Sequence, residues 1–381
     1  MRKINFNEPY ITGLEKEYIL DVFDQHRFYG SGKYTKLSTD LIKQRISSEN
    51  VLLTDSCTSA LEIVALLLRE HGTRQEVILP SYTFSSTASA FARAGFTVVF
   101  CEIDPQSMML DPVDVEKRIT PDTIAVVAVH YGGHCCKITE LKELCERHNL
   151  KLVEDAAQAF DSYLEGRALG TFGDFGCFSF HETKNIHAGL SGALTVKSDV
   201  MFRRASHIWE RGTNRQEVLK GIADKYSWVE IGGSFYPTEM QAAFLYAQLQ
   251  HLDENREQRR LIYEAYREGF DILGNEGKLK FPTYLEGVSS NYHAFFVLFP
   301  SEEKCDLVRE YLSSHNIAAY IGYVPLHSSP VGKRMGYTSE SLPLTECSAK
   351  CVLRMPFHNS LTIEDVKYVV NKVREAMELI K

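Results

Sequence analysis

The chain has 381 residues and 44% of them are hydrophobic, so it is long and apolar enough for a large core and for two domains. Its net charge of −8 comes from acidic and basic residues mixed along the chain. This excludes the basic field that would attract nucleic acid or an anionic membrane.

The nine cysteines are odd in number and show neither a C-x-x-C pair nor zinc-ribbon spacing. They predict reduced thiols in a cytoplasmic protein. The first residues lack the apolar run of a signal peptide, and no later segment approaches the roughly 18 uncharged residues of a membrane span. We therefore expect no membrane partner.

Strand-like and helix-like periods alternate along the first part of the chain. We predict helices over 13–26, 58–68 (ended by Gly72), 85–94 and 141–148, and strands over 51–54, 77–79, 97–101, 124–129 and 152–155. Strands that are apolar on both faces and separated by helices indicate an α/β fold with a mostly parallel sheet covered on both sides. Ligands are expected at the carboxyl ends of these strands.

A long helical region over 239–268 is predicted to connect to a smaller C-terminal α+β domain. That domain has a predicted strand over 294–299 and helices over 305–315 and 362–380. The last helix has an apolar stripe of Val366, Val369, Val370, Val373 and Met377. The pattern predicts a large domain over 1–245 and a small one over 246–381.

Two charged residues each follow an apolar strand: Asp155 ends one, and Lys184 comes shortly after another. A lysine amine can bond to the aldehyde of pyridoxal phosphate, and a carboxylate can keep the pyridine nitrogen of that cofactor protonated. The alternatives are a helix N-cap for Asp155 and a surface lysine for Lys184. The pair predicts a pyridoxal phosphate enzyme.

Two further strand ends suit the same cofactor. Ser56-Cys57-Thr58-Ser59 stands where a strand turns into a helix, so its N–H and hydroxyl groups could hold a phosphate, or could simply cap the helix. The segment Pro80-Ser81-Tyr82-Thr83-Phe84 could stack an aromatic on a ring, or place it in the core.

Two segments resemble known binding motifs, one a nucleotide-binding loop and the other a metal site, but neither has the residues that its motif requires. In Gly30-Ser31-Gly32-Lys33 the residue after the lysine is Tyr34 instead of Ser or Thr, so we expect a turn near the mouth of the active site. The set His130, His134, Cys135 and Cys136 has adjacent thiols and no second ligand pair, so no metal is predicted.

The ordered set of motifs resembles one known family, the DegT/DnrJ/EryC1/StrS sugar aminotransferases, which have the aspartate-aminotransferase type I fold. The resemblance covers nearly the whole chain and rests on residues 56–61, 80–84, 129–133, 153–158 and 179–185. Through 181–185 and 211–215 the chain most resembles the dTDP-4-amino-4,6-dideoxygalactose transaminases of surface-polysaccharide synthesis.

The resemblance implies roles for individual residues. Lys184 is the lysine that bonds to the cofactor, Asp155 contacts the pyridine nitrogen, and Phe84 stacks on the ring. The other implied cofactor contacts are Gln158 near the ring oxygen and Cys57, Thr58, Ser59 and Ser179 around the phosphate. The resemblance also implies L-glutamate as donor and a homodimer with its active sites at the subunit interface.

Two departures from the family pattern leave some roles open. Where many members carry Gly-Glu-Gly-Gly, this chain has 189–192 as Gly-Leu-Ser-Gly, so a role for that glutamate is absent. Where many place a neighbouring subunit's asparagine on the phosphate, this chain has Phe235-Tyr236-Pro237-Thr238. Phosphate contact across the dimer therefore stays open.

The nucleotide diphosphate of the substrate needs local cations or hydroxyls, since the protein is acidic. The candidates for substrate binding are Lys33, His130, Arg211, Asn214, Arg215, Tyr323 and His327, with ordinary solvated charges as the alternative for the basic groups. Other functions remain open: amination of a 3-keto sugar, a pyridoxamine-dependent dehydratase, or a non-catalytic cofactor-binding regulator or scaffold. The resemblance implies that such dehydratases have histidine in place of the lysine, so Lys184 is evidence against that function.

Overall fold

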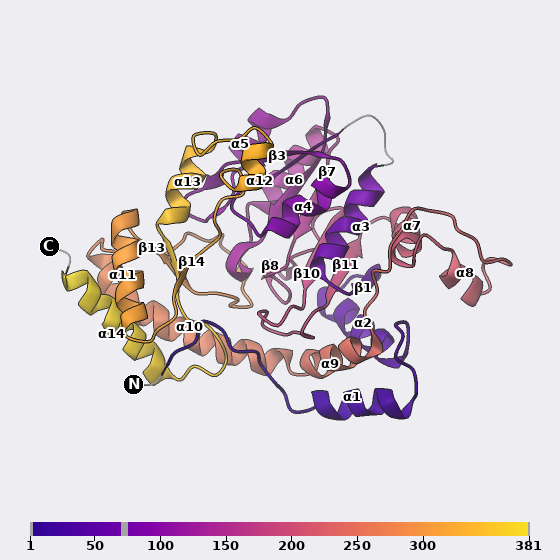
Figure 1. Cartoon of the computed structure of the whole chain (residues 1–381), viewed down its shortest axis with the longest axis horizontal. Coiled ribbons are helices and arrows are strands. Elements are labelled where there is room, and N and C mark those ends of the chain that lie inside the picture. Colours follow the sequence, from indigo (N-terminus) through magenta and orange to yellow (C-terminus); the bar gives the residue numbers. More distant parts are fainter. Residues whose placement is uncertain (1–2, 70–74, 380–381) are drawn as a thin grey trace.

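The fold is built on a central seven-stranded sheet, in a computed structural model that describes residues 3–69 and 75–379 (Figure 1). The strand order is β1-β11-β10-β7-β6-β2-β3. The bounds are β1 (Val51–Thr54), β2 (Glu76–Pro80), β3 (Thr97–Cys101), β6 (Thr123–Val129), β7 (Lys151–Asp155), β10 (Phe175–Ser179) and β11 (Gly192–Val196). Strands β10, β7, β6, β2 and β3 pair in parallel, and β11 is antiparallel to both its neighbours. The predicted mostly parallel sheet is confirmed.

Helices cover both faces of this sheet because its strands are apolar on both sides. Side chains alternate between two cores: Val51 and Leu53 join one cluster, and Leu52 between them joins the other. One face packs against α3 (Cys57–Arg69), α4 (Ser85–Arg93) and α7 (Asp199–Trp209). The other packs against α2 (Lys33–Ile46), α5 (Pro112–Arg118), α6 (Ile138–Arg147) and α9 (Glu239–Leu249). The predicted end of α3 at Gly72 lies outside the described residues.

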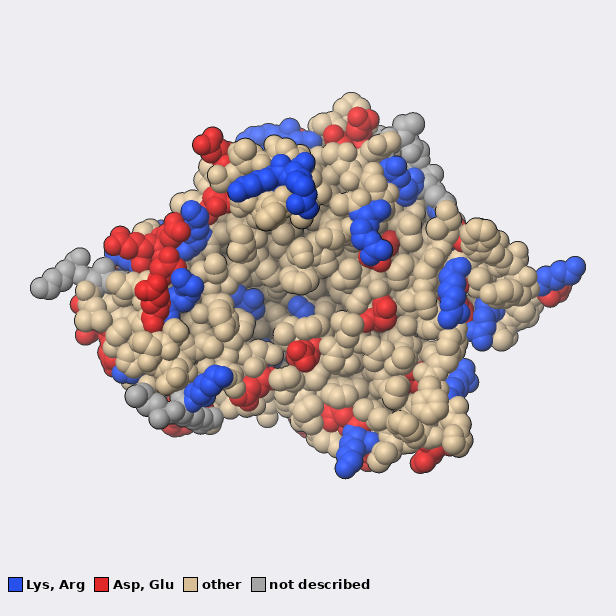
Figure 2. Space-filling view, viewed as in Figure 1, with Lys and Arg blue, Asp and Glu red and all other residues tan. Residues whose placement is uncertain are grey.

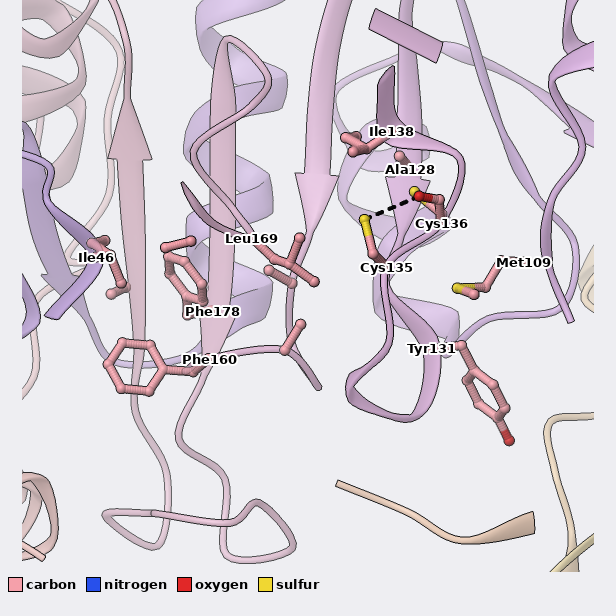
Figure 3. Close-up of a cluster of buried hydrophobic side chains, with 14 of the residues drawn as sticks. Ile46, Met109, Ala128, Tyr131, Cys135, Cys136, Ile138, Phe160, Leu169 and Phe178 are labelled. Carbon is pink, nitrogen blue, oxygen red and sulfur yellow. Dashed lines mark hydrogen bonds between the residues drawn. The ribbon is translucent and has the colours of Figure 1, made fainter. Parts of the chain in front are cut away.

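Figure 3 shows the core on the second face, where Cys135 and Cys136 are buried among apolar side chains. The Cys135 thiol donates to the Cys136 carbonyl oxygen at 3.1 Å, so it acts as a packed core residue. Phe160 and Phe178 meet edge to face at 5.4 Å between ring centroids. Within residues 3–69 and 75–379, no group of three or more His, Cys, Asp or Glu side chains could hold a metal ion.

The segment Gly30 to Lys33 is a turn that leads into α2, a helix for which we made no prediction. The carboxylate of Glu239, from α9, accepts N–H bonds from Gly32 at 2.8 Å and Tyr34 at 2.9 Å. A side chain on Gly32 would come within 2.5 Å of that carboxylate. The protein's own anion therefore fills the start of α2, at the N–H groups that a phosphate would otherwise contact.

The C-terminal part contains a second, antiparallel sheet in the order β13-β15-β14, packed against helices. Its elements are α10 (Leu252–Asn275), β13 (Phe296–Leu298), α11 (Glu302–Ser314), β14 (Tyr320–Ile321), α12 (Pro330–Arg334), α13 (Pro343–Lys350), β15 (Val352–Arg354) and α14 (Ile363–Leu379). The predicted valine stripe of α14 is buried, as expected. The predicted helical region over 239–268 is confirmed and consists of two helices: α9 ends at Leu249 and α10 begins at Leu252, because His251 has a non-helical backbone.

Shorter elements complete the chain. They are α1 (Glu15–Asp24), β4 (Ile103–Asp104), β5 (Met109–Leu110), β8 (Tyr163–Leu164), β9 (Arg167–Ala168), α8 (Arg215–Leu219) and β12 (Val288–Ser289). Near the N-terminus Ile4 pairs with Ile317 and joins the hydrophobic cluster of the C-terminal part, so the N-terminal segment packs on that part of the molecule (Figure 1). The division into 1–245 and 246–381 stays a prediction. Among the described helices, none has the length and apolar character needed to cross a membrane.

Candidate active site

A cavity of about 360 Å³ lies at the carboxyl ends of the parallel strands, between the central sheet and the C-terminal part. The segments that follow β1, β2, β6, β7 and β10 all contribute to its lining. Figure 2 shows the cavity as a hollow in the middle of the face turned toward the viewer, with atoms of Lys or Arg side chains at its floor. The position agrees with the rule that ligands of open α/β sheets bind beyond the carboxyl ends of strands.

Lys184 stands in a tight turn after β10 and lines the cavity. Its N–H donates to the carbonyl of His181 at 2.8 Å, and the Glu182 N–H donates to Gly189 at 2.9 Å, so the backbone of this turn is fixed. Burial lowers the pKa of the Lys184 amine from 10.5 to about 8. At pH 7 roughly one amine in ten is then neutral and nucleophilic, against fewer than about one in a thousand for an ordinary lysine.

Asp155, the last residue of β7, presents a buried carboxylate to the same cavity. The Thr87 hydroxyl donates to one oxygen at 2.7 Å and the Ala157 N–H donates to the other at 3.1 Å. Burial nevertheless raises the pKa of Asp155. Within the described residues this carboxylate forms no salt bridge, although the charge of Lys184 in the same cavity acts on it and favours its ionised form.

Aromatic and amide groups form one wall. Phe84 precedes α4 and is 60% exposed, which is unusual for a phenylalanine at a site lined mainly by buried groups. Its ring centroid lies 6.2 Å from that of Tyr323. Gln158 donates to the Tyr323 hydroxyl at 2.7 Å and accepts the Gly132 N–H at 2.7 Å, which fixes its amide. The exposed ring is therefore available to a planar ligand.

The start of α3 supplies the small hydroxyl residues. The Ser56 hydroxyl accepts the Ser59 N–H at 3.1 Å and lies 2.9 Å from the Ser59 hydroxyl, so Ser56 acts as the helix cap. Cys57, Thr58 and Ser179 line the cavity beside it. The Cys57 thiol is buried, and burial raises its pKa well above the ordinary value, so it is a packing group here.

These residues fit pyridoxal phosphate. A partly neutral amine, a buried carboxylate without a salt bridge, an exposed aromatic ring and a helix start lined with hydroxyls surround one cavity. A protonated pyridine nitrogen is the cation that would compensate Asp155. The individual roles of Lys184, Asp155, Phe84, Gln158, Cys57, Thr58, Ser59 and Ser179 stay predictions.

Four of the candidate substrate residues do not line this cavity in the single chain. Lys33 pairs with Asp21 at 2.8 Å, and Arg215 pairs with the buried Glu210 at 2.6 Å. The Arg211 guanidinium lies 5.1 Å from the centroid of the Tyr236 ring. The remaining one, Asn214, uses its side chain to hold its own loop, accepting the N–H of residue 227 at 2.8 Å and donating to the carbonyl of residue 225 at 3.0 Å.

The other three candidates for substrate binding differ in how they lie relative to the cavity. Tyr323 lines the cavity. His130 reaches its wall but is fully buried, with Nε2 2.9 Å from Glu154. His327 is also fully buried and lies outside the cavity lining, with Nδ1 2.7 Å from the Ser81 hydroxyl. The side chains of these two histidines are therefore packed in the interior of the described structure.

Sequence reasoning missed cavity residues that come from the C-terminal part. His293 Nδ1 lies 2.9 Å from the side-chain oxygen of Asn185, the neighbour of Lys184. Arg354, the last residue of β15, also lines the cavity. A single arginine within the apolar run 352–357 was the only available signal for it. No local pattern connects either residue to Lys184, because they are more than a hundred positions away.

Comparison with known proteins identifies the family. The model of the DegT/DnrJ/EryC1/StrS aminotransferase family matches residues 9–374. The chain is 29% identical to the dTDP-4-dehydro-2,3,6-trideoxy-D-glucose 4-aminotransferase of Saccharopolyspora spinosa, over 98% of this chain and 97% of that protein. It is 30% identical to the UDP-N-acetyl-3-dehydro-alpha-D-glucosamine 3-aminotransferase of Acidithiobacillus ferrooxidans, over 84% and 83%.

The fold agrees with this similarity. The crystal structure of the aminotransferase TlmJ from Streptoalloteichus hindustanus superposes with a TM-score of 0.90 at 28% identity and covers 100% of both chains. Family match, fold and cavity chemistry thus agree over nearly the whole sequence. The chain belongs to the DegT/DnrJ/EryC1/StrS aminotransferase family and is a pyridoxal-phosphate-dependent sugar aminotransferase.

Proposed function

We propose that the protein transfers the amino group of L-glutamate to C4 of a nucleotide-linked 4-keto-6-deoxyhexose, converting dTDP-4-dehydro-6-deoxyglucose to dTDP-4-amino-4,6-dideoxygalactose for surface-polysaccharide synthesis. The observation that carries the transfer chemistry is the single cavity that holds the low-pKa amine of Lys184 and the buried carboxylate of Asp155. The choice of sugar rests on the motifs over 181–185 and 211–215.

The roles of the chain's own residues follow from this chemistry. Bound pyridoxal phosphate supplies an aldehyde that carries the amino group and a ring that accepts electrons. In the first half-reaction the neutral Lys184 amine moves a proton from the α-carbon of the donor to C4′ of the cofactor. Asp155 would keep the pyridine nitrogen of the bound cofactor protonated. In the second half-reaction Lys184 delivers a proton to the sugar carbon.

A relative with a stated activity supports amination at C4. The name of the Saccharopolyspora spinosa relative assigns it to carbon 4 of a dTDP-linked keto sugar, and that alignment spans 98% of this chain. Two GDP-perosamine synthases, from Escherichia coli O157:H7 and Vibrio cholerae, also align over 98% of the chain at 26% identity. These relatives bind sugars linked to different nucleotides, so they support the reaction type more strongly than the base.

The second candidate is amination of a 3-keto sugar nucleotide. The Acidithiobacillus ferrooxidans relative is named as a 3-aminotransferase, and a dTDP-3-amino-3,4,6-trideoxy-alpha-D-glucose transaminase from Micromonospora megalomicea is 31% identical. Both alignments cover less of the chain, 84% and 85%, than the 98% covered by the relative named as a 4-aminotransferase. We therefore keep C4 as the proposal.

Product analysis tests the choice of carbon. With dTDP-4-dehydro-6-deoxyglucose and L-glutamate, we expect one 2-oxoglutarate for each amino sugar, and a small H3–H4 coupling in the proton spectrum that identifies the axial, galacto amine. The 3-keto isomer is expected to react at least about tenfold more slowly, because its ketone is displaced from the proton-transfer position. Faster amination of the 3-keto isomer would establish the second candidate instead.

We further propose that the active site is completed by a second copy of the chain. The segment from Arg211 to Tyr236, which includes α8, projects from the body of the molecule (Figure 1). It exposes large apolar side chains: Leu219 65%, Ile222 68%, Trp228 75% and Ile231 71%. The same segment has the two arginines, Arg211 and Arg215, that lie outside the cavity of their own chain. A twofold dimer could place them at the partner's cavity.

Mixing two impaired variants tests this arrangement. We expect Lys184→Ala to be inactive, and Arg211→Gln/Arg215→Gln to be impaired in sugar binding. If the arginines act across the interface, an equal mixture after subunit exchange regains about a quarter of the sites, because only one site in each heterodimer has both intact parts. If the mixture regains nothing, or the protein sediments with the mass of one chain, the proposed dimer site is wrong.

A further inference from the structure

Five polar residues form a closed circuit of hydrogen bonds that connects the turn of Lys184 to α10 and to the C-terminal part. The contacts are Asn185 Oδ1 to His293 Nδ1 (2.9 Å), the His293 carbonyl to Arg259 Nη2 (2.7 Å), Arg259 Nη1 to Asn359 Oδ1 (3.0 Å), Asn359 Nδ2 to the Asn255 carbonyl (3.1 Å) and Asn255 Nδ2 to the Asn185 carbonyl (2.8 Å). The side chains of Asn255, Arg259 and His293 are buried. The circuit therefore fixes Asn185, the neighbour of Lys184, against segments that are distant in the sequence.

This circuit decides which nitrogen of His293 has the proton. The Asn185 amide donates through Nδ2 to the carbonyl of Asn291 at 2.7 Å, so its oxygen Oδ1 can only accept. His293 Nδ1, which lies 2.9 Å from that oxygen, must therefore be the N–H donor. Burial, followed by the positive charges of Lys184 and two arginines, lowers the pKa of His293 well below its ordinary value. The imidazole is thus neutral at pH 7, and its other nitrogen, Nε2, is a hydrogen-bond acceptor.

This acceptor borders the same space as the Lys184 amine. His293 and Lys184 line the active-site cavity and also a second cavity of about 20 Å³, so both side chains lie where the two cavities meet. Among the charged groups that act on His293, Lys184 has the largest effect. Within residues 3–69 and 75–379, neither His293 Nε2 nor Lys184 Nζ has a hydrogen-bond partner, and neither atom is fully enclosed. A neutral acceptor and an amine therefore both remain available in one cavity.

The other donors that enter this cavity suit the acceptor less well. Bound pyridoxal phosphate presents mainly acceptor oxygens, and we assign its pyridine N–H to Asp155. The amino donor and the keto sugar occupy the cavity in different half-reactions. Lys184 is present in both, and in the proposed mechanism it gains a proton in each of them. The group that this acceptor can serve throughout the reaction is therefore the amine of Lys184.

We propose that His293 is a positioning residue for Lys184: with the cofactor bound, its Nε2 accepts a hydrogen bond from the Lys184 amine once that amine has taken up the transferred proton. This deepens the proposed function and rests on the role of Lys184 in it. A C–H bond of the donor breaks as an N–H bond of Lys184 forms, and that N–H bond breaks as the C–H bond at C4′ forms. His293 keeps its own proton throughout and holds the amine in the orientation that the second transfer needs.

Two amide substitutions separate the two nitrogens of His293. The amide of asparagine reaches the position of Nδ1, and the amide of glutamine reaches that of Nε2. His293→Asn can therefore keep the bond to Asn185 without the acceptor, and His293→Gln can keep the acceptor without that bond. We expect His293→Asn to slow both half-reactions roughly tenfold to a hundredfold, with the apparent dissociation constant of L-glutamate within about twofold of the wild type. His293→Gln should stay within about fivefold of the wild-type rates. His148→Asn, at an exposed histidine that ends α6, is the matched control.

The pKa of Lys184 gives a readout that does not depend on turnover. It is measured by competitive acetylation and peptide mapping of protein loaded with pyridoxamine phosphate, in which the lysine is free. The titratable groups of the chain that act on this amine are Cys57 of α3, Asp155 of β7 and Arg354 of β15, and the test leaves them unchanged. A neutral acceptor favours the protonated amine. The pKa should therefore fall by roughly one unit in His293→Asn and stay near the wild-type value in His293→Gln.

The opposite pattern would contradict this role. If His293→Asn behaves like the wild type, with His293→Gln either impaired or unchanged, the proposal is wrong. If both variants are impaired or fail to fold, histidine ¹⁵N spectra of the wild type and Lys184→Ala, both with pyridoxamine phosphate, decide the question. Loss of the lysine should shift the acceptor-type nitrogen of one histidine, and identical spectra overturn the proposal. Near-wild-type rates in Lys184→Ala would instead contradict the proposed function itself, so the two failures are distinguishable.

Discussion

Replacing Lys184 with alanine is expected to lower the rate of both half-reactions by roughly 10³- to 10⁴-fold or more, since a positioned acid–base group alone contributes about 10² to 10⁴. The structural reason is that Lys184 is the amine with the lowered pKa in the cavity, in a turn fixed by the hydrogen bonds of residues 182 and 184. Single-turnover kinetics followed by cofactor absorbance measure the loss.

Two controls show whether the loss belongs to that amine. Borohydride reduction of the cofactor-loaded wild type followed by peptide mapping should label position 184, and Lys184→Ala should take up no label. Lys333→Ala, at an exposed lysine of α12, should react like the wild type. If the label appears at another lysine, or Lys184→Ala retains near-wild-type half-reaction rates, the central assignment fails.

Replacing Asp155 with asparagine is expected to slow the glutamate half-reaction by roughly 10²- to 10³-fold, the range seen when one preorganised electrostatic group is lost. The side chain keeps its shape, and an amide oxygen can still accept the Ala157 N–H that now bonds to the carboxylate at 3.1 Å. What disappears is the negative charge behind the ring, so the cofactor loses its preference for a protonated nitrogen. Stopped-flow absorbance with saturating L-glutamate gives the rate.

The stability of the same variant distinguishes this role from a helix cap. Burial raises the pKa of Asp155, so the cofactor-free protein bears a cost for holding this carboxylate charged. Asp155→Asn should therefore leave the melting temperature of the cofactor-free protein unchanged or raise it by a few degrees. A drop in melting temperature together with an unchanged half-reaction rate would show that Asp155 is structural. Thr87→Val, which removes the hydroxyl donor at 2.7 Å, should show a smaller loss of rate in the same direction.

The elements that the sequence predicted well are those with a strong local period. Strands 51–54 and 97–101 are found with the expected bounds. A run that is apolar on both faces can bury both of them only in a sheet that is covered on both sides. Strand β11 and helix α2 were not predicted. The helical region over 239–268 was predicted without the break at 250–251, where His251 has a non-helical backbone.

The candidate site divides in a similar way. Residues at strand ends, such as Asp155 and Phe84, could be predicted because parallel strands bring their carboxyl ends to one edge. The cationic candidates Lys33, Arg211 and Arg215 were chosen by charge alone. In the structure each contacts a neighbour in its own chain, an acid or an aromatic ring, instead of the cavity. The positive charge of a side chain shows that it can bind an anion. Where that side chain lies depends on contacts between residues that are far apart in the sequence.

The order of motifs along the chain was thus enough to predict the covered sheet and the cofactor, and to propose the amine and the carboxylate that would serve it, because each motif lies within a few residues of the strand that positions it. Folding alone decided that Glu239 fills the start of α2 and that Arg354, Phe6 and His293 join Lys184 around one cavity. Those contacts connect segments separated by more than a hundred residues. Their energies depend on burial and on unpaired charge, and neither of these is defined until the chain has packed.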